Sequence, residues 1–167
     1  MIELATKEDL TQVEMIMKTI KEEMRLEGNP QWGSTDDDYP SVAKLLDDID
    51  KQKMIKYVEN NTIKGIVSLA IDTSREFDGL LENSQKDAIV IHRLAIPQEY
   101  RKQQIATKLI QYAEVHAKNH QVSVLKSSTE VSNDKMNKFL LRHGFVQKGN
   151  YTYEDYPGVY NYFEKEI

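Results

Sequence analysis

The segment from Ala88 to Ile110 contains the residues whose types and spacing best suit a chemical task. An apolar, largely β-branched run from Ala88 to Ile96 predicts a buried strand, which Pro97 interrupts. A basic turn with Arg101 and Lys102 then leads into an amphipathic helical pattern. A strand that feeds a helix start in this way gathers unpaired backbone N–H groups at the positive end of the helix dipole. The segment therefore predicts a phosphate-binding turn.

The same turn resembles motif A of the Gcn5-related N-acetyltransferase (GNAT) family, in which Val/Ile-Pro-x-x-Tyr-Arg ends a strand and Arg/Gln-x-x-Gly-x-Gly/Ala follows. Arg101, Ile105 and Ala106 fit this motif, whereas Gln104 stands where the family has its central glycine. The segment from Asn133 to Phe145 resembles motif B, an asparagine-bearing helix that leads to a Gly-Phe pair and a strand. Two motifs in the family's order strengthen the resemblance.

The resemblance implies transfer of an acetyl group from acetyl-CoA to an amine. The pantetheine arm of the cofactor would lie along the strand before Pro97 and pair with its main chain, and the pyrophosphate would rest on the N–H groups that follow Arg101. Asn133 would bond the cofactor or nearby backbone, or would serve only the helix end. The implied cofactor-binding residues are Leu94, Ala95, Ile96, Arg101, Lys102, Gln103, Gln104, Ile105, Ala106, Thr107 and Asn133.

Gln104 is the departure from motif A with the clearest physical consequence. Glycine lets a backbone approach a ligand closely, and that freedom is lost here. The glutamine side chain would either crowd the pyrophosphate or donate an amide hydrogen bond of its own. We expect weaker CoA binding than with glycine, and we expect Gln104→Gly to tighten it at a stability cost of up to about 1 kcal/mol.

Proton transfer is the second chemical requirement, because an alkyl ammonium has a pKa near ~10.4 and only the neutral amine attacks a thioester. His92 is the preferred base, since it lies on the predicted cofactor strand and an unperturbed histidine has a pKa of about 6.5. The alternative is a half-buried structural histidine. Glu99 is the second candidate base, although its place in a turn after Pro97 also suggests solvent exposure or a structural hydrogen bond. The tyrosine that serves the family as general acid, four residues before Gly-Phe, is replaced by Leu140, so the proton would come from water or another tyrosine.

Three aromatic residues are candidates for the acceptor site. Trp32 and Tyr39 lie between the first two predicted helices, in a loop that borders the acceptor in the family, and Tyr160 lies on the last predicted strand. Packing of these rings within the loop and the sheet is the alternative for all three. The run Asp36–Asp38 could attract a cationic amine or form a solvated turn.

Composition excludes several other functions. The chain has 167 residues, a net charge of −5 and no cysteine. The acidic balance argues against nucleic acid as a partner, and no apolar run reaches the ~18 residues that a membrane helix needs. Without cysteine there is no disulfide and no acyl-cysteine intermediate, so we expect direct transfer.

His116 and His120 have the i, i+4 spacing of a metal pair but no recognisable third ligand, so no metal site is expected. The N-terminus lacks a signal pattern, which favours a cytoplasmic protein.

Periodicity predicts that strands and helices alternate along one domain, residues 1–167. Thr6 with Asp9 predicts a capped first helix, Ser41 caps a second, and residues 53–71 suggest a hairpin. Residues 73–87 are polar and predict a loop. The expected class is α/β (α+β): the GNAT fold, with a central mixed, mostly antiparallel twisted sheet of about seven strands flanked by four helices.

The sequence thus predicts an N-acetyltransferase that acts on a primary amine of a small molecule or on a peptide amino terminus. The alternative is a non-catalytic acyl-CoA-binding or regulatory domain of the same fold, favoured by Gln104 and Leu140. Assembly as a homodimer is left open, and one sequence does not identify the acceptor.

Overall fold

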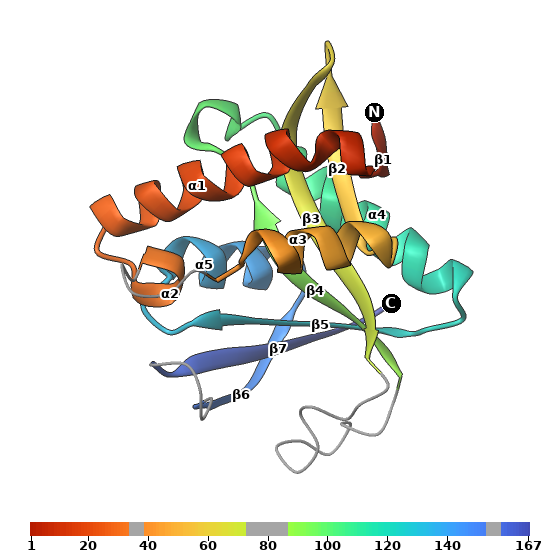
Figure 1. The fold of residues 1–167 in the computed structure, drawn as a ribbon. Coiled ribbons are helices and arrows are strands. Elements are labelled where there is room, and N and C mark those ends of the chain that lie inside the picture. Colours follow the sequence, from red (N-terminus) through yellow and green to blue (C-terminus); the bar gives the residue numbers. More distant parts are fainter. Residues whose placement is uncertain (34–38, 73–86, 153–157) are drawn as a thin grey trace. The chain divides into compact units, whose positions relative to one another are not determined.

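The computed structural model describes residues 1–33, 39–72, 87–152 and 158–167 (Figure 1). The acidic run Asp36–Asp38 and all but the last residue of the predicted loop 73–87 lie outside these ranges. The elements in chain order are β1 (Ile2–Leu4), the 3-10 turn η1 (Lys7–Asp9), α1 (Leu10–Leu26), α2 (Pro30–Gly33), α3 (Val42–Asp50), β2 (Met54–Glu59), β3 (Thr62–Asp72), β4 (Ala88–Ala95), the 3-10 turn η2 (Gln98–Tyr100), α4 (Ile105–Asn119), β5 (Val124–Glu130), α5 (Asp134–Arg142), β6 (Val146–Tyr151) and β7 (Tyr160–Glu166).

The seven strands form one open mixed sheet with the order β1-β2-β3-β4-β5-β7-β6. The pairs β1–β2, β2–β3, β5–β7 and β6–β7 are antiparallel, and β4 pairs with β5 in parallel. This confirms the predicted class and the mixed, mostly antiparallel sheet. There are five α-helices in the described residues rather than the four predicted, because Pro30–Gly33, taken as loop, forms a single turn of helix.

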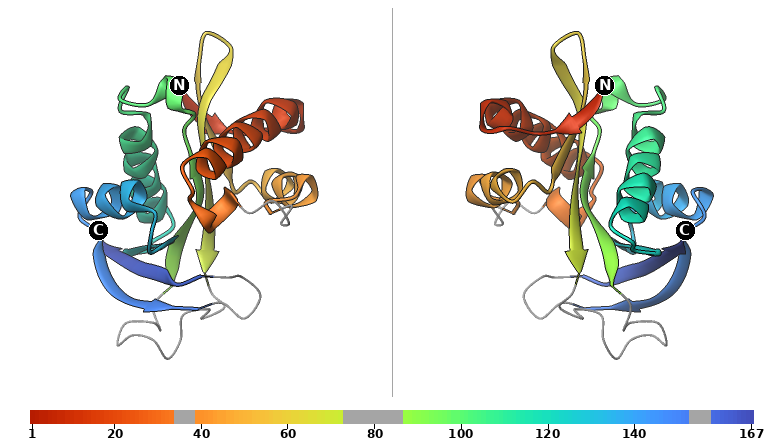
Figure 2. Two further views of the ribbon diagram at one scale, coloured as in Figure 1. Left: turned by 90° about the vertical axis from the view of Figure 1, so that its left-hand side faces the viewer. Right: turned by 90° about the vertical axis from the view of Figure 1, so that its right-hand side faces the viewer.

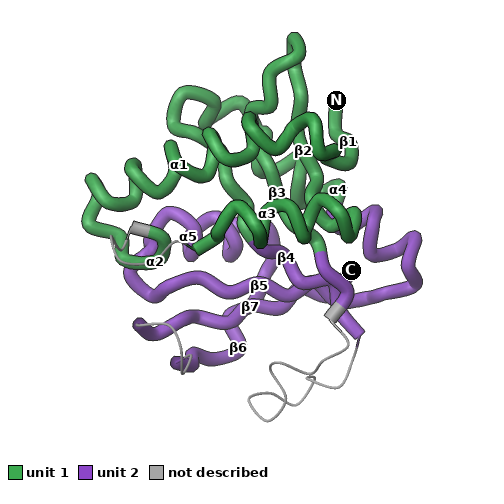
Figure 3. The backbone as a smooth tube through the Cα atoms, viewed as in Figure 1, with its two compact units in different colours: residues 1–69, 93–112 green, residues 70–92, 113–167 purple. Residues whose placement is uncertain are grey.

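The chain divides into two compact units, coloured separately in Figure 3. Unit 1 comprises Met1–Leu69 and Arg93–Tyr112, and unit 2 comprises Ala70–His92 and Ala113–Ile167. The strands β3 and β4 and the helix α4 each contribute to both units. A single domain over residues 1–167 therefore stays a prediction.

Unit 1 is built on a hydrophobic core between α1, α3 and the strands β2 and β3. The predicted capping box at the start is present, with the Thr6 N–H donating to Asp9 Oδ2 at 2.7 Å, and Ser41 Oγ accepts from Lys44 N at 3.2 Å at the start of α3. Figure 2 shows α1 and α3 on one side of β2 and β3, with the beginning of α4 on the other. The buried core residues are Ala5, Val13, Ile16, Met17, Ile20, Leu45, Ile49, Met54, Ile63, Ile66 and Ala95.

Unit 2 pairs β4, β5, β7 and β6, with α5 following β5. Lys165 on β7 donates to the His143 carbonyl oxygen at 2.6 Å and to Glu114 Oε1 at 2.7 Å, so its side chain points to the face covered by α4 and α5. The preceding residue, Glu164, therefore points to the opposite face. On that face Tyr162 donates to Glu164 at 2.7 Å, and Lys126 stands directly across from Glu164 in the pairing of β5 with β7.

Candidate active site

The predicted phosphate-binding turn lies directly before α4. Lys102 and Gln104 have positive φ values of 64° and 59°, and both side chains are exposed. Successive residues of opposite hand, such as Gln104 and the helical Ile105, turn their N–H groups toward one concave spot, which suits an anion. The first bond of the helix joins Lys108 N to Gln104 O at 3.0 Å, so the amides of residues 105–107 precede the helical ladder. This part of unit 1 has the geometry of a phosphate seat.

The conformation of Gln104 reverses one expectation. The position that holds glycine in motif A is a left-handed position here, occupied by a residue with a Cβ. A non-glycine residue in this region costs about 1–2 kcal/mol, and glycine adopts it freely. The predicted stability cost of Gln104→Gly is therefore wrong in sign, because it assumed a helical backbone.

Arg101 has a different local role from the one implied by the resemblance. Its Nε donates to the Ile96 carbonyl oxygen at 3.0 Å, and its guanidinium pairs with Glu23 of α1. The other oxygen of Glu23 accepts from Gln98 N at 2.8 Å. Arg101 and Glu23 together close the turn between β4 and α4, so the guanidinium is already bonded. Direct contact between Arg101 and a phosphate stays a prediction.

Gly65 on β3 allows the start of α4 to pack close to the sheet. A Cβ at this residue would lie 3.0 Å from Cγ2 of Ile105 and 3.0 Å from Cγ1 of Ile96. These distances are shorter than ordinary van der Waals contacts, so with a larger residue the Ile96 and Ile105 side chains would have to shift by a few tenths of an ångström. Close packing at the predicted phosphate seat thus favours a small residue at Gly65, a position outside motif A.

The strand β4 carries the candidate base and the candidate pantetheine contacts. His92 is half-buried, and Leu94, Ala95 and Ile96 are buried or half-buried. Pairing with β5 covers Ile89–Ile91. The strand is then irregular, because Arg93 has a φ of 51°. This left-handed residue breaks the alternation of side chains and reorients the peptide groups next to His92 and Leu94.

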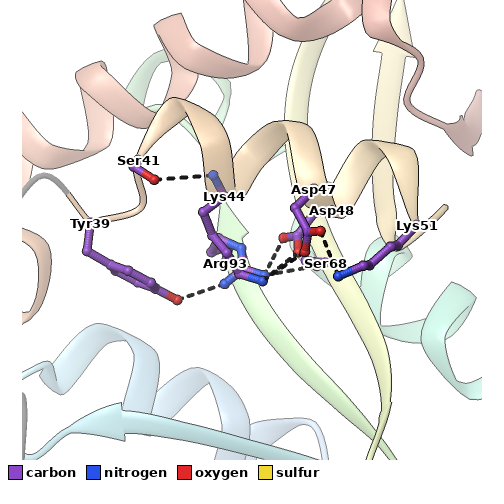
Figure 4. Close-up of polar contacts among 8 residues, drawn as sticks. All are labelled: Tyr39, Ser41, Lys44, Asp47, Asp48, Lys51, Ser68 and Arg93. Carbon is purple, nitrogen blue, oxygen red and sulfur yellow. Dashed lines mark hydrogen bonds and ion pairs between the residues drawn. The ribbon is translucent and has the colours of Figure 1, made fainter.

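Arg93 is the centre of a buried polar cluster that sequence reasoning missed (Figure 4). Its Nη1 donates to the Tyr39 hydroxyl oxygen at 2.7 Å, and its Nη2 donates to Ser68 Oγ at 3.2 Å and to Asp48 of α3. The Arg93 and Asp48 side chains are 4% and 0% exposed. Two features of the sequence could have indicated this cluster. One is a lone arginine in an apolar strand, and the other is an aspartate at the margin of the apolar stripe of α3.

The buried Asp48 also lies beside Lys44, a partly exposed residue of α3. Lys44 Nζ lies 3.3 Å from Asp48 Oδ1 and 3.5 Å from Asp47 Oδ2, and Lys51 Nζ lies 2.6 Å from Asp47 Oδ1. Within the described residues, Arg93 Nε has no hydrogen-bond partner, and Asp48 Oδ1 accepts no hydrogen bond but is paired with the Lys44 ammonium. A buried ion pair with unsatisfied atoms contributes little to stability.

Glu99 and Tyr100 lie in the turn η2. Glu99 is exposed, and desolvation together with the adjacent, hydrogen-bonded Glu99 carboxylate raises the pKa of Tyr100. Lys64 Nζ lies 5.5 Å from the centroid of the Tyr100 ring. Glu99 thus interacts locally within the turn, which agrees with the alternative of an exposed residue that makes a structural hydrogen bond. Its catalytic role stays a prediction.

In unit 2 the predicted helix-end role of Asn133 is present. The Asn133 side chain accepts from Met136 N at 3.3 Å and caps α5. Leu140, where the family's tyrosine would stand, is fully buried. Tyr160 is 8% exposed and its ring lies 6.2 Å from that of Tyr151. The contact with Tyr151 agrees with the packing alternative for Tyr160. Its place in the acceptor site and cofactor binding by Asn133 stay predictions.

The acceptor-side candidates of unit 1 differ in what they contact. Trp32 is partly buried and packs against the hydrophobic core of unit 1, as its structural alternative requires. Tyr39 is half-buried, and its hydroxyl joins the Arg93 cluster. Tyr39 is therefore the candidate with a polar group held in a defined position.

The His116 and His120 rings lie 4.3 Å apart, and burial with the neighbouring His120 lowers the pKa of His116. No group of three potential metal-binding side chains occurs among the residues that the structure describes. The described helices include none that is long and apolar enough to cross a membrane.

Comparison with known proteins decides the family. The sequence model of the Acetyltransferase (GNAT) family matches residues 15–145. The chain belongs to the GNAT family. No curated protein sequence matches it.

Solved structures of GNAT proteins share the fold of this chain. A GNAT acetyltransferase from Streptococcus agalactiae has a TM-score of 0.84 at 20% identity, covering 100% of this chain and 95% of its own. One from Listeria monocytogenes has a TM-score of 0.77 at 17% identity, with 100% and 94% covered. PaiA N-acetyltransferase from Thermoplasma acidophilum, solved in complex with coenzyme A, has a TM-score of 0.77 at 19% identity, with 100% and 98% covered.

Proposed function

We propose that this GNAT protein transfers an acetyl group from acetyl-CoA directly to a primary amine of a small molecule or to a peptide amino terminus. The observation that carries the proposal is the seat formed by the left-handed Lys102 and Gln104 and the amides of residues 105–107. Backbone N–H groups at a helix start suit a pyrophosphate. The PaiA structure with coenzyme A supports the choice of donor.

The seat suits phosphate because its donors are backbone groups at the positive end of α4. Each charge-assisted hydrogen bond contributes roughly 1.5–3 kcal/mol, so a few such bonds are enough for micromolar affinity. The side chains of Lys102, Gln103 and Gln104 are exposed and add a charge and amide groups at the rim. Leu94, Ala95 and Ile96 would supply main-chain groups for the pantetheine arm.

In the reaction the amine nitrogen attacks the carbonyl carbon of the thioester, the carbon–sulfur bond breaks, and the thiolate takes up a proton. His92 would accept the proton that the attacking nitrogen loses. Leu140 is apolar and buried, so it donates no proton to the sulfur. Water or a tyrosine would supply that proton.

Thermal-shift titration with acetyl-CoA and CoA tests the donor site. Release of free thiol in the presence of a panel of amines then tests turnover. We expect a rise in melting temperature with both ligands and thiol release with at least one amine. The absence of any shift would contradict the proposal.

The alternative function is acyl-CoA binding without catalysis, and the buried Leu140 is the observation that favours it. In that case CoA and acetyl-CoA would both raise the melting temperature while no amine would release thiol. A cytoplasmic location and a homodimer are further parts of the proposal. Sedimentation velocity with and without CoA tests the dimer.

A further inference from the structure

Glu23 of α1 bonds to both ends of the turn that leads to the phosphate seat. One carboxylate oxygen accepts from Gln98 N at 2.8 Å, and the other pairs with the Arg101 guanidinium. Arg101 Nε in turn donates to the Ile96 carbonyl oxygen at 3.0 Å. We refer to Glu23 and Arg101 as the clamp. All four residues belong to unit 1 (Figure 3).

Glu23 lies in the stripe of α1 that faces the core. Val13, Ile16 and Ile20 are buried at helical spacing, and Glu23 follows at the next position of the same stripe. Its side chain is 15% exposed. A carboxylate at such a position loses hydration, so its ion pair contributes little net stability. The contacts of Glu23 therefore fix the geometry of the turn more than they stabilise the fold.

The clamp restrains the chain at the start of the seat. Arg101 directly precedes Lys102, whose φ of 64° opens the left-handed part of the seat. At the other end, Ile105 packs beside Gly65 of β3. A left-handed residue other than glycine keeps its conformation only where its surroundings hold it. The side chains of Lys102 and Gln104 are exposed, so the restraint comes from the residues on either side.

The negative charge of Glu23 makes its role testable by sign. A carboxylate repels a phosphate, so by electrostatics alone its neutralisation should tighten CoA binding. Loss of the clamp instead frees the chain before the seat, and the ligand must then order this chain at the expense of binding free energy. The two effects have opposite signs.

We propose that Glu23 and Arg101 are positioning residues for the acyl donor. Together they hold the backbone of the seat in its phosphate-binding shape, and Arg101 acts through Glu23 and the Ile96 carbonyl group instead of touching a phosphate. This inference rests on the proposed acetyl transfer and deepens it. It gives α1 a part in donor binding that motif A does not include.

Calorimetric titration of CoA into Glu23→Gln tests the sign. Glutamine keeps the shape of the side chain, but its amide has a single acceptor oxygen, so it cannot bond both Gln98 and Arg101 as the carboxylate does. We expect CoA affinity to fall by about fivefold or more, which corresponds to about 1 kcal/mol. A smaller loss, or tighter binding, would overturn the proposal.

Arg101→Lys separates the shape of the guanidinium from its charge. Lysine keeps the charge but lacks the rigid fork, so it cannot bond Ile96 and Glu23 in the same geometry. We expect CoA affinity to fall by about threefold or more, and a smaller loss would mean that charge alone suffices. The double variant with Glu23→Gln should bind no more weakly than the weaker single variant, because both changes break one clamp. Additive losses would contradict a shared role.

The ion pair of Glu22 with Arg25 supplies matched controls on the same helix. Arg25 Nε and Nη2 donate to the two carboxylate oxygens of Glu22 at 2.8 Å and 2.6 Å, in an exposed pair. Glu22→Gln and Arg25→Lys repeat the same two substitutions within α1 and should leave CoA affinity within about twofold of the wild type. A loss as large as that of Glu23→Gln would refute the assignment.

Kinetics distinguish donor positioning from a loss of folded protein. Glu23→Gln should raise KM for acetyl-CoA while kcat and the KM for the amine stay within about twofold. A change confined to kcat, as partial unfolding would give, would contradict the proposal. If the wild-type protein does not bind CoA, the proposed function fails and this inference fails with it. Normal CoA binding by the wild type, with equal affinity in Glu23→Gln, would refute only the positioning role.

Discussion

Replacement of Gln104 by glycine gives the sharpest test of the phosphate seat. Gln104 has a φ of 59°, a conformation that costs a residue with a Cβ about 1–2 kcal/mol and costs glycine nothing. Glycine adds roughly 0.5–1 kcal/mol of unfolded-state entropy. The difference predicts that Gln104→Gly stabilises the fold by about 0.5–1 kcal/mol. For a chain of this size such a gain raises the melting temperature by about 1–4 °C.

The same change should tighten binding of acetyl-CoA by about three- to tenfold, because the amides of residues 105–107 can then approach the pyrophosphate without a side chain at the rim. Isothermal titration calorimetry measures the affinity, and a thermal melt without ligand measures the stability. Affinity and melting temperature should rise together.

Gln104→Ala is the matched control, since alanine removes the long side chain but keeps the left-handed penalty of a Cβ. We expect it to tighten binding while leaving the melting temperature unchanged or lower. A fall in melting temperature for Gln104→Gly would refute the backbone argument. Weaker binding by both variants would show that the Gln104 amide itself contacts the ligand.

Other predictions concern the base, the turn and the first capping box. His92→Ala should reduce kcat by roughly 10²–10⁴ and remove the rise of kcat/KM between about pH 6 and 8, with CoA affinity within a few-fold; unchanged kinetics would make His92 structural. Glu23→Gln should weaken CoA binding if Arg101 serves the turn, whereas tighter binding would mean that the released guanidinium reaches the phosphates. Burial opposes ionisation of Asp9, but bonds from Lys56 and the capping threonine outweigh it and lower the pKa of Asp9. Its stabilisation is therefore present above about pH 4 and lost in acid, so Asp9→Asn should cost about 1 kcal/mol in chemical denaturation at pH 7 and little near pH 3.

Local chemistry in the sequence was sufficient to predict most elements of the fold. The reciprocal bonds of Thr6 and Asp9 and the cap at Ser41 need only residues three positions apart, and both are present. The turn before α4 was also predictable, because it follows from a strand, a Pro-marked break and a helix start; phosphate binding by its backbone groups stays a prediction. The helical turn Pro30–Gly33 was missed because four residues are too few for a periodic pattern.

The polar cluster could not be predicted because its members are distant in the chain. Arg93 meets Asp48 across 45 residues and Tyr39 across 54, and no spacing rule connects them. The left-handed φ of Arg93 was equally hidden, since a β-branched, apolar neighbourhood predicts a regular strand. For Arg101 the residue type suggested a phosphate ligand, but its carboxylate partner Glu23 lies 78 residues away.

The close packing at Gly65 has a consequence for how this seat tolerates sequence change. Phosphate would be held by peptide groups, and the side chains of Lys102, Gln103 and Gln104 point into solvent. Substitutions among these three residues therefore alter charge and backbone strain but keep every donor. A methyl group at Gly65 would lie 3.0 Å from side-chain atoms of Ile96 and Ile105, so residues on both sides of the turn would have to give way by a few tenths of an ångström. Side chains can therefore vary more freely in the turn than at Gly65 of β3, where close packing favours a small residue.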